Sequence, residues 1–110
     1  MKFNDGDIVK VVRAVRQTKL IEAMNKREKT FLKVPIGSVG RVDMKIFRNR
    51  SDRKRGNVMY KITFYFQFPS RIRLIQGVHE VIHWTYGDGL ELANEEDKDN
   101  FIGMEVAKNI

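Results

Sequence analysis

The stretch that most restricts the fold is Met-Tyr-Lys-Ile-Thr-Phe-Tyr-Phe at residues 59–66. Aromatic and β-branched side chains dominate it, and such side chains are favoured on the pleated surface of a strand. We therefore predict a strand at 59–66 and, with it, a domain built mainly of β-structure.

Further strands are indicated on either side of this one. The β-branched run 8–15 follows the turn residues Gly6 and Asp7, which predicts an opening strand. Residues 39–46 alternate with period two, and Gly40 within them suggests a bend or bulge. Residues 90–93 form a short closing strand after the turn at 86–89.

Two connections and one ambiguous region complete the chain. Residues 16–33 contain a helix-compatible patch, which fits one or two helical turns or an extended hairpin-like loop. Residues 48–57 are a polar basic loop. The 71–85 region fits strands that turn near Gln76 and Gly77, or alternatively a helix. Its glycine and β-branched residues favour strands.

Five or six short strands left as an open sheet expose unpaired backbone groups, and closing the sheet removes them. A chain of 110 residues has room for one such domain. The predicted fold is a small SH3-like barrel over residues 1–93, with a long first loop. Residues 94–110 form an acidic C-terminal extension, with a short strand or helix near 101–106.

An ordered set of short motifs resembles the SH3-like barrels of the KOW and Tudor type. The resemblance covers most of residues 5–93 and implies a module that binds nucleic acid, ribosomes, polymerases or protein segments. The chain departs from the family's pattern in three places. The first loop is long, the 66–85 region has extra length, and the acidic tail is additional. The motifs are Gly-Asp-Ile-Val-Lys-Val-Val (6–12), Gly-Ser-Val-Gly-Arg-Val (37–42), Tyr-Lys-Ile-Thr-Phe (60–64) and Asp-Gly-Leu-Glu-Leu-Ala (88–93).

The composition excludes several classes of protein. With no cysteine in the chain, a disulfide framework, a thiolate nucleophile and a cysteine-based zinc site are impossible. The N-terminus lacks an apolar signal core, and no run approaches the roughly 20 apolar residues of a membrane span. We expect a cytoplasmic protein that needs no cofactor. No phosphate-binding glycine loop or catalytic triad pattern is present either, so we do not expect an enzyme.

The charge is spread unevenly. Residues 1–93 hold 19 Lys and Arg against 9 Asp and Glu, whereas residues 94–110 hold 2 against 5. A basic body predicts a polyanionic partner, and the acidic tail is expected to fold back on it. The first hypothesis is a module that binds nucleic acid or a nucleoprotein complex. The second is an accessory or inhibitory factor that docks on an acidic protein.

Arginine and lysine in the loops are the candidate binding residues, because guanidinium groups bind phosphate oxygens bidentately. Two aromatic residues, Tyr65 and Trp84, are expected to be exposed and to stack on a ligand, since each carries a polar group at its edge. The basic candidates are Arg13, Arg16, Lys19, Arg27, Arg48, Arg50, Arg53, Lys54, Arg55, Arg71 and Arg73, with Lys26, Lys29 and Lys33 beside them.

Residues 79–83 spell His-Glu-Val-Ile-His, the H-E-x-x-H signature of zinc proteases. On a helix, His79 and His83 are about 5–6 Å apart and can share one metal ion. On a strand the same spacing separates them by about 13 Å. The metalloprotease is therefore the least favoured hypothesis, and it requires 78–86 to be helical.

Overall fold

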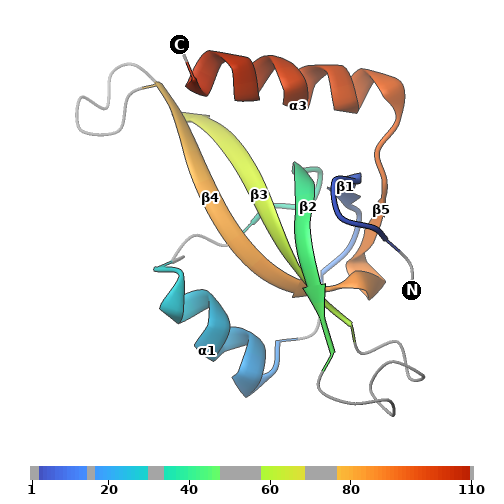
Figure 1. The fold of residues 1–110 in the computed structure, drawn as a ribbon, viewed down its shortest axis with the longest axis vertical. Helices are drawn as coiled ribbons and strands as arrows, with labels where there is room; N and C mark the ends of the chain where they lie inside the picture. Colours follow the sequence, from blue (N-terminus) through green and yellow to red (C-terminus); the bar gives the residue numbers. More distant parts are fainter. Residues whose placement is uncertain (1–2, 15–16, 30–33, 48–57, 69–76, 110) are drawn as a thin grey trace.

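Five strands form one antiparallel sheet in the computed structural model of the chain, with an α-helix across each end (Figure 1). The structure describes residues 3–14, 17–29, 34–47, 58–68 and 77–109. The elements are β1 Ile8–Val11, α1 Lys19–Arg27, β2 Val39–Ile46, β3 Met59–Phe68, β4 Gly77–Tyr86, the short 3-10 helix η1 Gly87–Gly89, β5 Leu90–Leu92 and α3 Glu95–Lys108.

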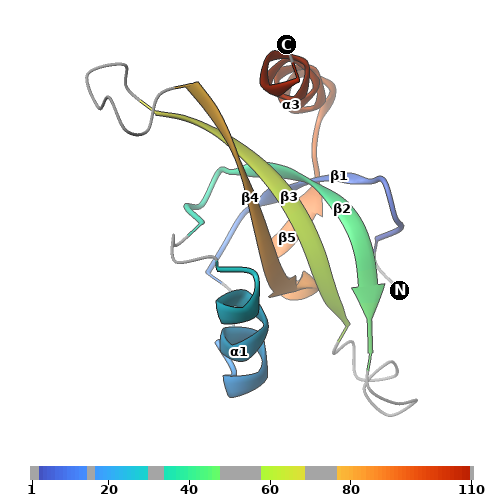
Figure 2. The same cartoon turned by 60° about the vertical axis from the view of Figure 1, so that its left-hand side comes forward.

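The strand order is β4-β3-β2-β1-β5. Within the described residues the sheet is not closed, because β4 and β5 lie at its two ends. It curls strongly (Figure 2), so a mainly β fold is confirmed, and its shape is compatible with a small barrel.

The longest ladder joins β3 to β4, and ten residue pairs run from Met59 opposite Tyr86 to Phe68 opposite Gly77. The predicted strand at 59–66 is thereby confirmed and extends two residues further. Alternate residues of β3 face opposite sides of the sheet. We call the side of Tyr60, Ile62 and Phe64 the inner face, and the opposite side the outer face.

The inner face carries the main core. Ile62, Phe64 and Tyr60 are at most 1% exposed, and the curl of the sheet brings β1 and β5 over them. The remaining buried members of this cluster are Phe3, Val9, Val11, Val42, Val58 and Leu90.

The outer face is covered at one end by α1. Ile21 of α1 packs with Met59, Trp84 and Tyr86 in a second buried cluster. Thr18 fixes the start of the helix, because its hydroxyl oxygen accepts the Ile21 amide at 3.2 Å. The sequence prediction for 16–33 left open a helix or an extended loop, and the described part contains a nine-residue helix.

Helix α3 covers the other end of the outer face and contacts β2, β3 and β4. Asn94 is its N-cap, since its side-chain oxygen accepts the Asp97 amide at 2.8 Å. The sequence predicted a short strand or helix near 101–106, whereas the helix spans Glu95–Lys108. Acidic residues in the first turn stabilise a helix N-terminus, which accounts for the early start.

Two sequence predictions need correction here. The opening strand stops at Val11 rather than at residue 15, because the strands on either side, β2 and β5, pair with β1 only as far as Lys10 and Val11. Residues 77–86 form one continuous strand, so the helical alternative is wrong for them and no turn interrupts them. Residues 71–76 lie outside the described part of the chain.

Gly40 sits where β2 passes closest to β3, and the register of these strands shifts between Val42 and Met44. A Cβ added to Gly40 would lie 2.5 Å from Ile62 Cγ2 and 2.8 Å from the Thr63 carbonyl oxygen. The predicted irregularity is therefore present as a bulge two residues further along, and Gly40 itself is required by close approach of the backbones.

We expect Gly40→Ala to lower the free energy of unfolding by about 1–3 kcal/mol, because the added methyl overpacks a backbone contact. Gly103→Ala is the matched control. Gly103 is helical with nothing within 4 Å of an added Cβ, so this variant should gain about 0.5–1 kcal/mol. Urea unfolding of both variants measures the difference, and equal effects would contradict the assignment.

Candidate functional site

Helix α1 and its flanks carry exposed cations. Arg13, Lys19 and Arg27 from the predicted set are exposed, as are Lys26 and Lys29. None of the five forms an ion pair with another described residue. We call these five residues the α1 cations.

The other basic candidates lie in segments outside the described residues, but the strands that flank two of these segments are placed. Ile46 pairs with Met59, and both pack at α1, so the described strand ends on either side of 48–57 lie at the α1 end. The paired strand ends Phe68 and Gly77 lie about 30 Å away along a ten-residue strand. The candidates outside the description are Arg16, Arg48, Arg50, Arg53, Lys54, Arg55, Arg71 and Arg73.

Trp84 is not the exposed stacking residue that the sequence suggested. Its side chain is 7% exposed in the cluster beneath α1. Asn25 of α1 holds the same residue by its backbone, since its side-chain oxygen accepts the Trp84 amide at 2.7 Å and its nitrogen donates to the Trp84 carbonyl at 3.1 Å. The side-chain amide thus satisfies backbone groups at the edge of the sheet.

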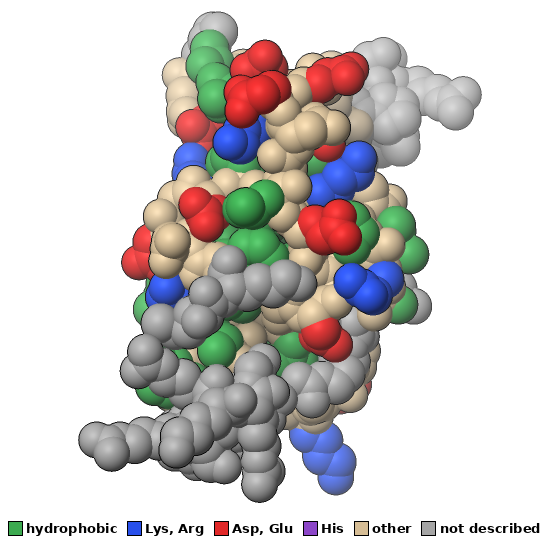
Figure 3. All heavy atoms as spheres, turned by 90° about the vertical axis from the view of Figure 1, so that its right-hand side faces the viewer, with side chains coloured by type: hydrophobic (Ala, Val, Ile, Leu, Met, Phe, Trp, Pro, Cys, Tyr) green, Lys and Arg blue, Asp and Glu red, His purple; other side chains and the backbone are tan. Residues whose placement is uncertain are grey.

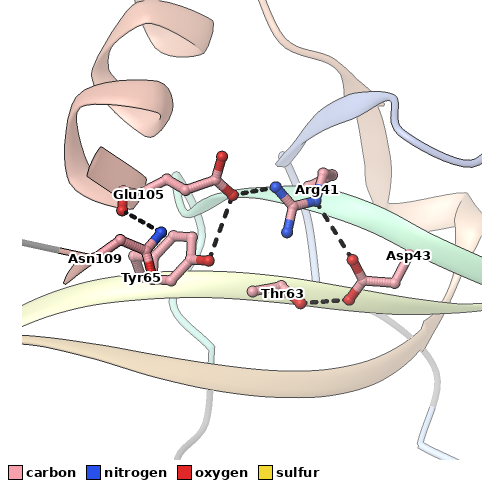
Figure 4. Close-up of polar contacts among 6 residues, drawn as sticks. All are labelled: Arg41, Asp43, Thr63, Tyr65, Glu105 and Asn109. Atoms are coloured by element: carbon pink, nitrogen blue, oxygen red, sulfur yellow. Dashed lines mark hydrogen bonds and ion pairs between the residues drawn. The ribbon is translucent and has the colours of Figure 1, made fainter. Parts of the chain in front are cut away.

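Tyr65 is half-buried, and α3 accounts for its cover. The Phe101 ring lies 5.4 Å from the Tyr65 ring, and the Glu105 carboxylate accepts the Tyr65 hydroxyl at 3.4 Å (Figure 4). Burial raises the pKa of Tyr65, and the nearby charges of Glu105 and Glu80 raise it further. The phenol therefore remains a hydrogen-bond donor.

Asp97, Phe101 and Glu105 of α3 contact side chains of the sheet, and they are spaced four apart, which places them on one face of the helix. Asp97 pairs with Lys10 at 3.3 Å, Phe101 is the one buried side chain of the helix, and Glu105 pairs with Arg41. We call Asp97, Phe101 and Glu105 the α3 stripe.

Arg41 is the centre of the polar network under α3 (Figure 4). Its Nε lies 3.4 Å from Asp43 Oδ1, its Nη1 donates to Glu105, and its Cζ is 5.8 Å from the Phe101 ring centroid. Burial alone lowers its pKa, but Glu105 and Asp43 outweigh that effect, so the pKa of Arg41 is raised. Thr63 completes the network by donating its hydroxyl to Asp43.

The attachment of α3 combines one buried apolar side chain with partly exposed ion pairs. Burying one large apolar side chain, here Phe101, is worth about 1.5–3 kcal/mol. The Lys10–Asp97 pair is partly exposed, with side-chain exposures of 39% and 21%, and such pairs contribute about 0–1 kcal/mol each.

The histidines of the H-E-x-x-H motif lie on β4. His79 and His83 share one face of a strand, about 13 Å apart, so the geometry required for a shared metal ion is not met. Across the parts of the chain that the structure describes, no group of three or more His, Asp or Glu is placed to hold a metal.

His83 instead belongs to the inner face. Its ring lies 6.4 Å from that of Phe64, and its buried Nδ1 has no hydrogen-bond partner among the described residues. Burial lowers the pKa of His83 below the ordinary value of 6.5. The residue is thus a neutral packing side chain.

Helix α3 carries five acidic residues, Glu95, Glu96, Asp97, Asp99 and Glu105. Figure 3 shows acidic side chains over α3 at the top of that view. Of the helices that the structure describes, neither is long and apolar enough to span a bilayer.

Comparison with known proteins adds no assignment: no family model, no curated protein and no solved structure matches the chain. The sequence analysis missed Lys10, Asn25 and Arg41. The position of Arg41 is revealed only by the register of the sheet, which places Arg41 opposite Thr63. The α3 stripe had a visible signal, namely two acids and a phenylalanine at intervals of four residues.

Because His83 is neutral in the fold, we expect stability to depend on pH. As pH falls below about 6.5, the unfolded chain gains a proton on this residue that the folded chain does not. The free energy of unfolding therefore decreases down to the lowered pKa and levels off below it. Urea unfolding between pH 8 and pH 5 checks this.

His83→Leu should remove the decrease in the free energy of unfolding that His83 causes at low pH. The control His79→Leu should keep this decrease. An unchanged slope in His83→Leu would contradict the role of His83.

Proposed function

We propose that this chain is a non-catalytic basic module that binds nucleic acid or a nucleoprotein complex. The α1 cations carry the proposal: five exposed positive side chains without an ion-pair partner among the described residues. The net charge of +7 supports it. Such a surface makes phosphate contacts whose strength depends on salt and little on sequence.

The resemblance to KOW and Tudor barrels supports the same proposal. Gly6 and Gly37 have φ values of 90° and 96° and lie in the turns that lead into β1 and β2. Such positive φ values favour glycine. Leu90 of the last motif begins β5, which pairs with β1. These turn glycines and the pairing of β5 with β1 support the resemblance.

A second candidate is an accessory factor that docks on an acidic protein. One observation favours it, since the chain's own acidic helix already binds Lys10 and Arg41. For either candidate we propose a cytoplasmic location, because the chain has no cysteine.

Binding of labelled RNA and DNA, followed by fluorescence anisotropy against salt concentration, tests the proposal. We expect affinity to fall steeply with salt. The double variant Lys26→Gln with Arg27→Gln should lower affinity. It should also reduce the slope of log affinity against log salt by about 0.7 for each single-strand phosphate that no longer meets a cation. Neutralising Arg48, Arg50, Arg53, Lys54 and Arg55 together should abolish binding.

The double variant Lys98→Gln with Lys108→Gln is the matched control, since it changes the net charge equally but on α3. It should bind almost as the parent does. Absence of binding to either nucleic acid at low salt would refute the proposal and leave the acidic protein partner.

A further inference from the structure

The α3 stripe contacts side chains of the sheet whose chemistry suits a binding surface. Beneath it lie two cations, Lys10 and Arg41, on neighbouring strands, and the aromatic ring of Tyr65 on the next strand. Figure 4 shows Arg41 and Tyr65 with Glu105 of the stripe. The stripe presents to them a carboxylate, an aromatic ring and a second carboxylate. About 12 Å of helix separates the first carboxylate from the last.

We propose that the outer face around Lys10, Arg41 and Tyr65 is a second binding site, for single-stranded nucleic acid, and that α3 covers it as an internal mimic of that ligand. The proposal rests on the proposed function, because it names a further site and its regulation in the same nucleic-acid-binding module.

The chemistry of each contact carries over to a nucleic-acid strand. The carboxylates of Asp97 and Glu105 stand where phosphate oxygens would meet an ammonium and a guanidinium. The Phe101 ring lies 5.4 Å from Tyr65 and beneath the Arg41 guanidinium, where a base would stack. An aromatic platform beside cations is the arrangement that binds single strands, because every base has a π-face.

Other charged groups at the site are compatible with this ligand. Asp43 stays paired with Arg41 on the side away from Glu105 and also accepts the Thr63 hydroxyl. It therefore orients the guanidinium and leaves the nitrogen that now binds Glu105 available to phosphate.

The two helices are joined to the sheet by different groups. Helix α1 buries Ile21 and Asn25, and Asn25 bonds to the backbone of β4. Helix α3 buries Phe101 and adds ion pairs to Lys10 and Arg41, while Ile102 and Val106 beside the stripe are 51% and 55% exposed. The ion pairs of α3 are open to competition, because a polyanion offers the same charge to Lys10 and Arg41.

Glu105→Gln tests the site in the full-length chain, with Glu96→Gln as the control. Both changes remove one negative charge from α3, but Glu96 is exposed and forms no ion pair with a described residue of the sheet. We expect Glu105→Gln to bind a fluorescent single-stranded oligonucleotide about fivefold more tightly or better. Glu96→Gln should change affinity less than about twofold. Phe101→Ala should act as Glu105→Gln does, and far-ultraviolet circular dichroism checks that each variant folds.

Adding Arg41→Gln or Tyr65→Leu to Glu105→Gln should cancel the gain, because the uncovered site then lacks one of its binding groups. Equal effects of Glu105→Gln and Glu96→Gln, with binding intact, would refute the covered site but leave the proposed function standing. Failure of every variant to bind at low salt would refute both. If Glu105→Gln binds a peptide of sequence 94–109 but gains nothing toward the oligonucleotide, the site is one for acidic protein segments and the proposal is wrong.

Discussion

The β3–β4 ladder is the constraint on which the rest of the structure depends. Its ten residue pairs carry large side chains on both faces, and an antiparallel hairpin with two apolar faces is not stable until both are covered. On the inner face, the curl of the sheet brings β1 and β5 over Ile62 and Phe64. On the outer face, α1 packs on Trp84 near one end and α3 packs on Tyr65 toward the other. Two separate helices thus cover this face.

The physical means of covering differ at the two ends, and the difference follows from the residues available. At the α1 end the exposed strand edge offers an amide and a carbonyl of Trp84, and Asn25 satisfies both. Once α1 packs over this edge, leaving these two groups without partners would cost about 1–3 kcal/mol, and Asn25 removes that cost. At the α3 end Arg41 has Asp43 as a partner within the sheet. Helix α3 is joined to the sheet there through side chains, among them Lys10 and Arg41.

Local patterns in the sequence were sufficient to identify β2, β3 and β5, because alternation and turn glycines are properties of a few consecutive residues. The limits of β1 were not predictable from its β-branched run, since they depend on where β2 and β5 begin. The burial of Trp84 depends likewise on a helix more than fifty residues away. The network under α3 needs the register that places Arg41 opposite Thr63, and no single-strand pattern contains it. Most of the predicted basic residues lie outside the described part of the chain, and they remain predictions.

The position of the acidic helix explains why the α1 cations have no carboxylate partner among the described residues. The sequence suggested that the tail would fold back on the basic body, and it does so, but at Lys10 and Arg41. Only Ala93 and Asn94 connect β5 to α3, so the helix begins close to where β5 ends and reaches the nearest part of the outer face. Net charge alone would draw the acidic residues toward every cation. The short connection instead directs them to two cations of the sheet, and Lys19, Lys26 and Arg27 of α1 form no ion pair with the described residues of α3.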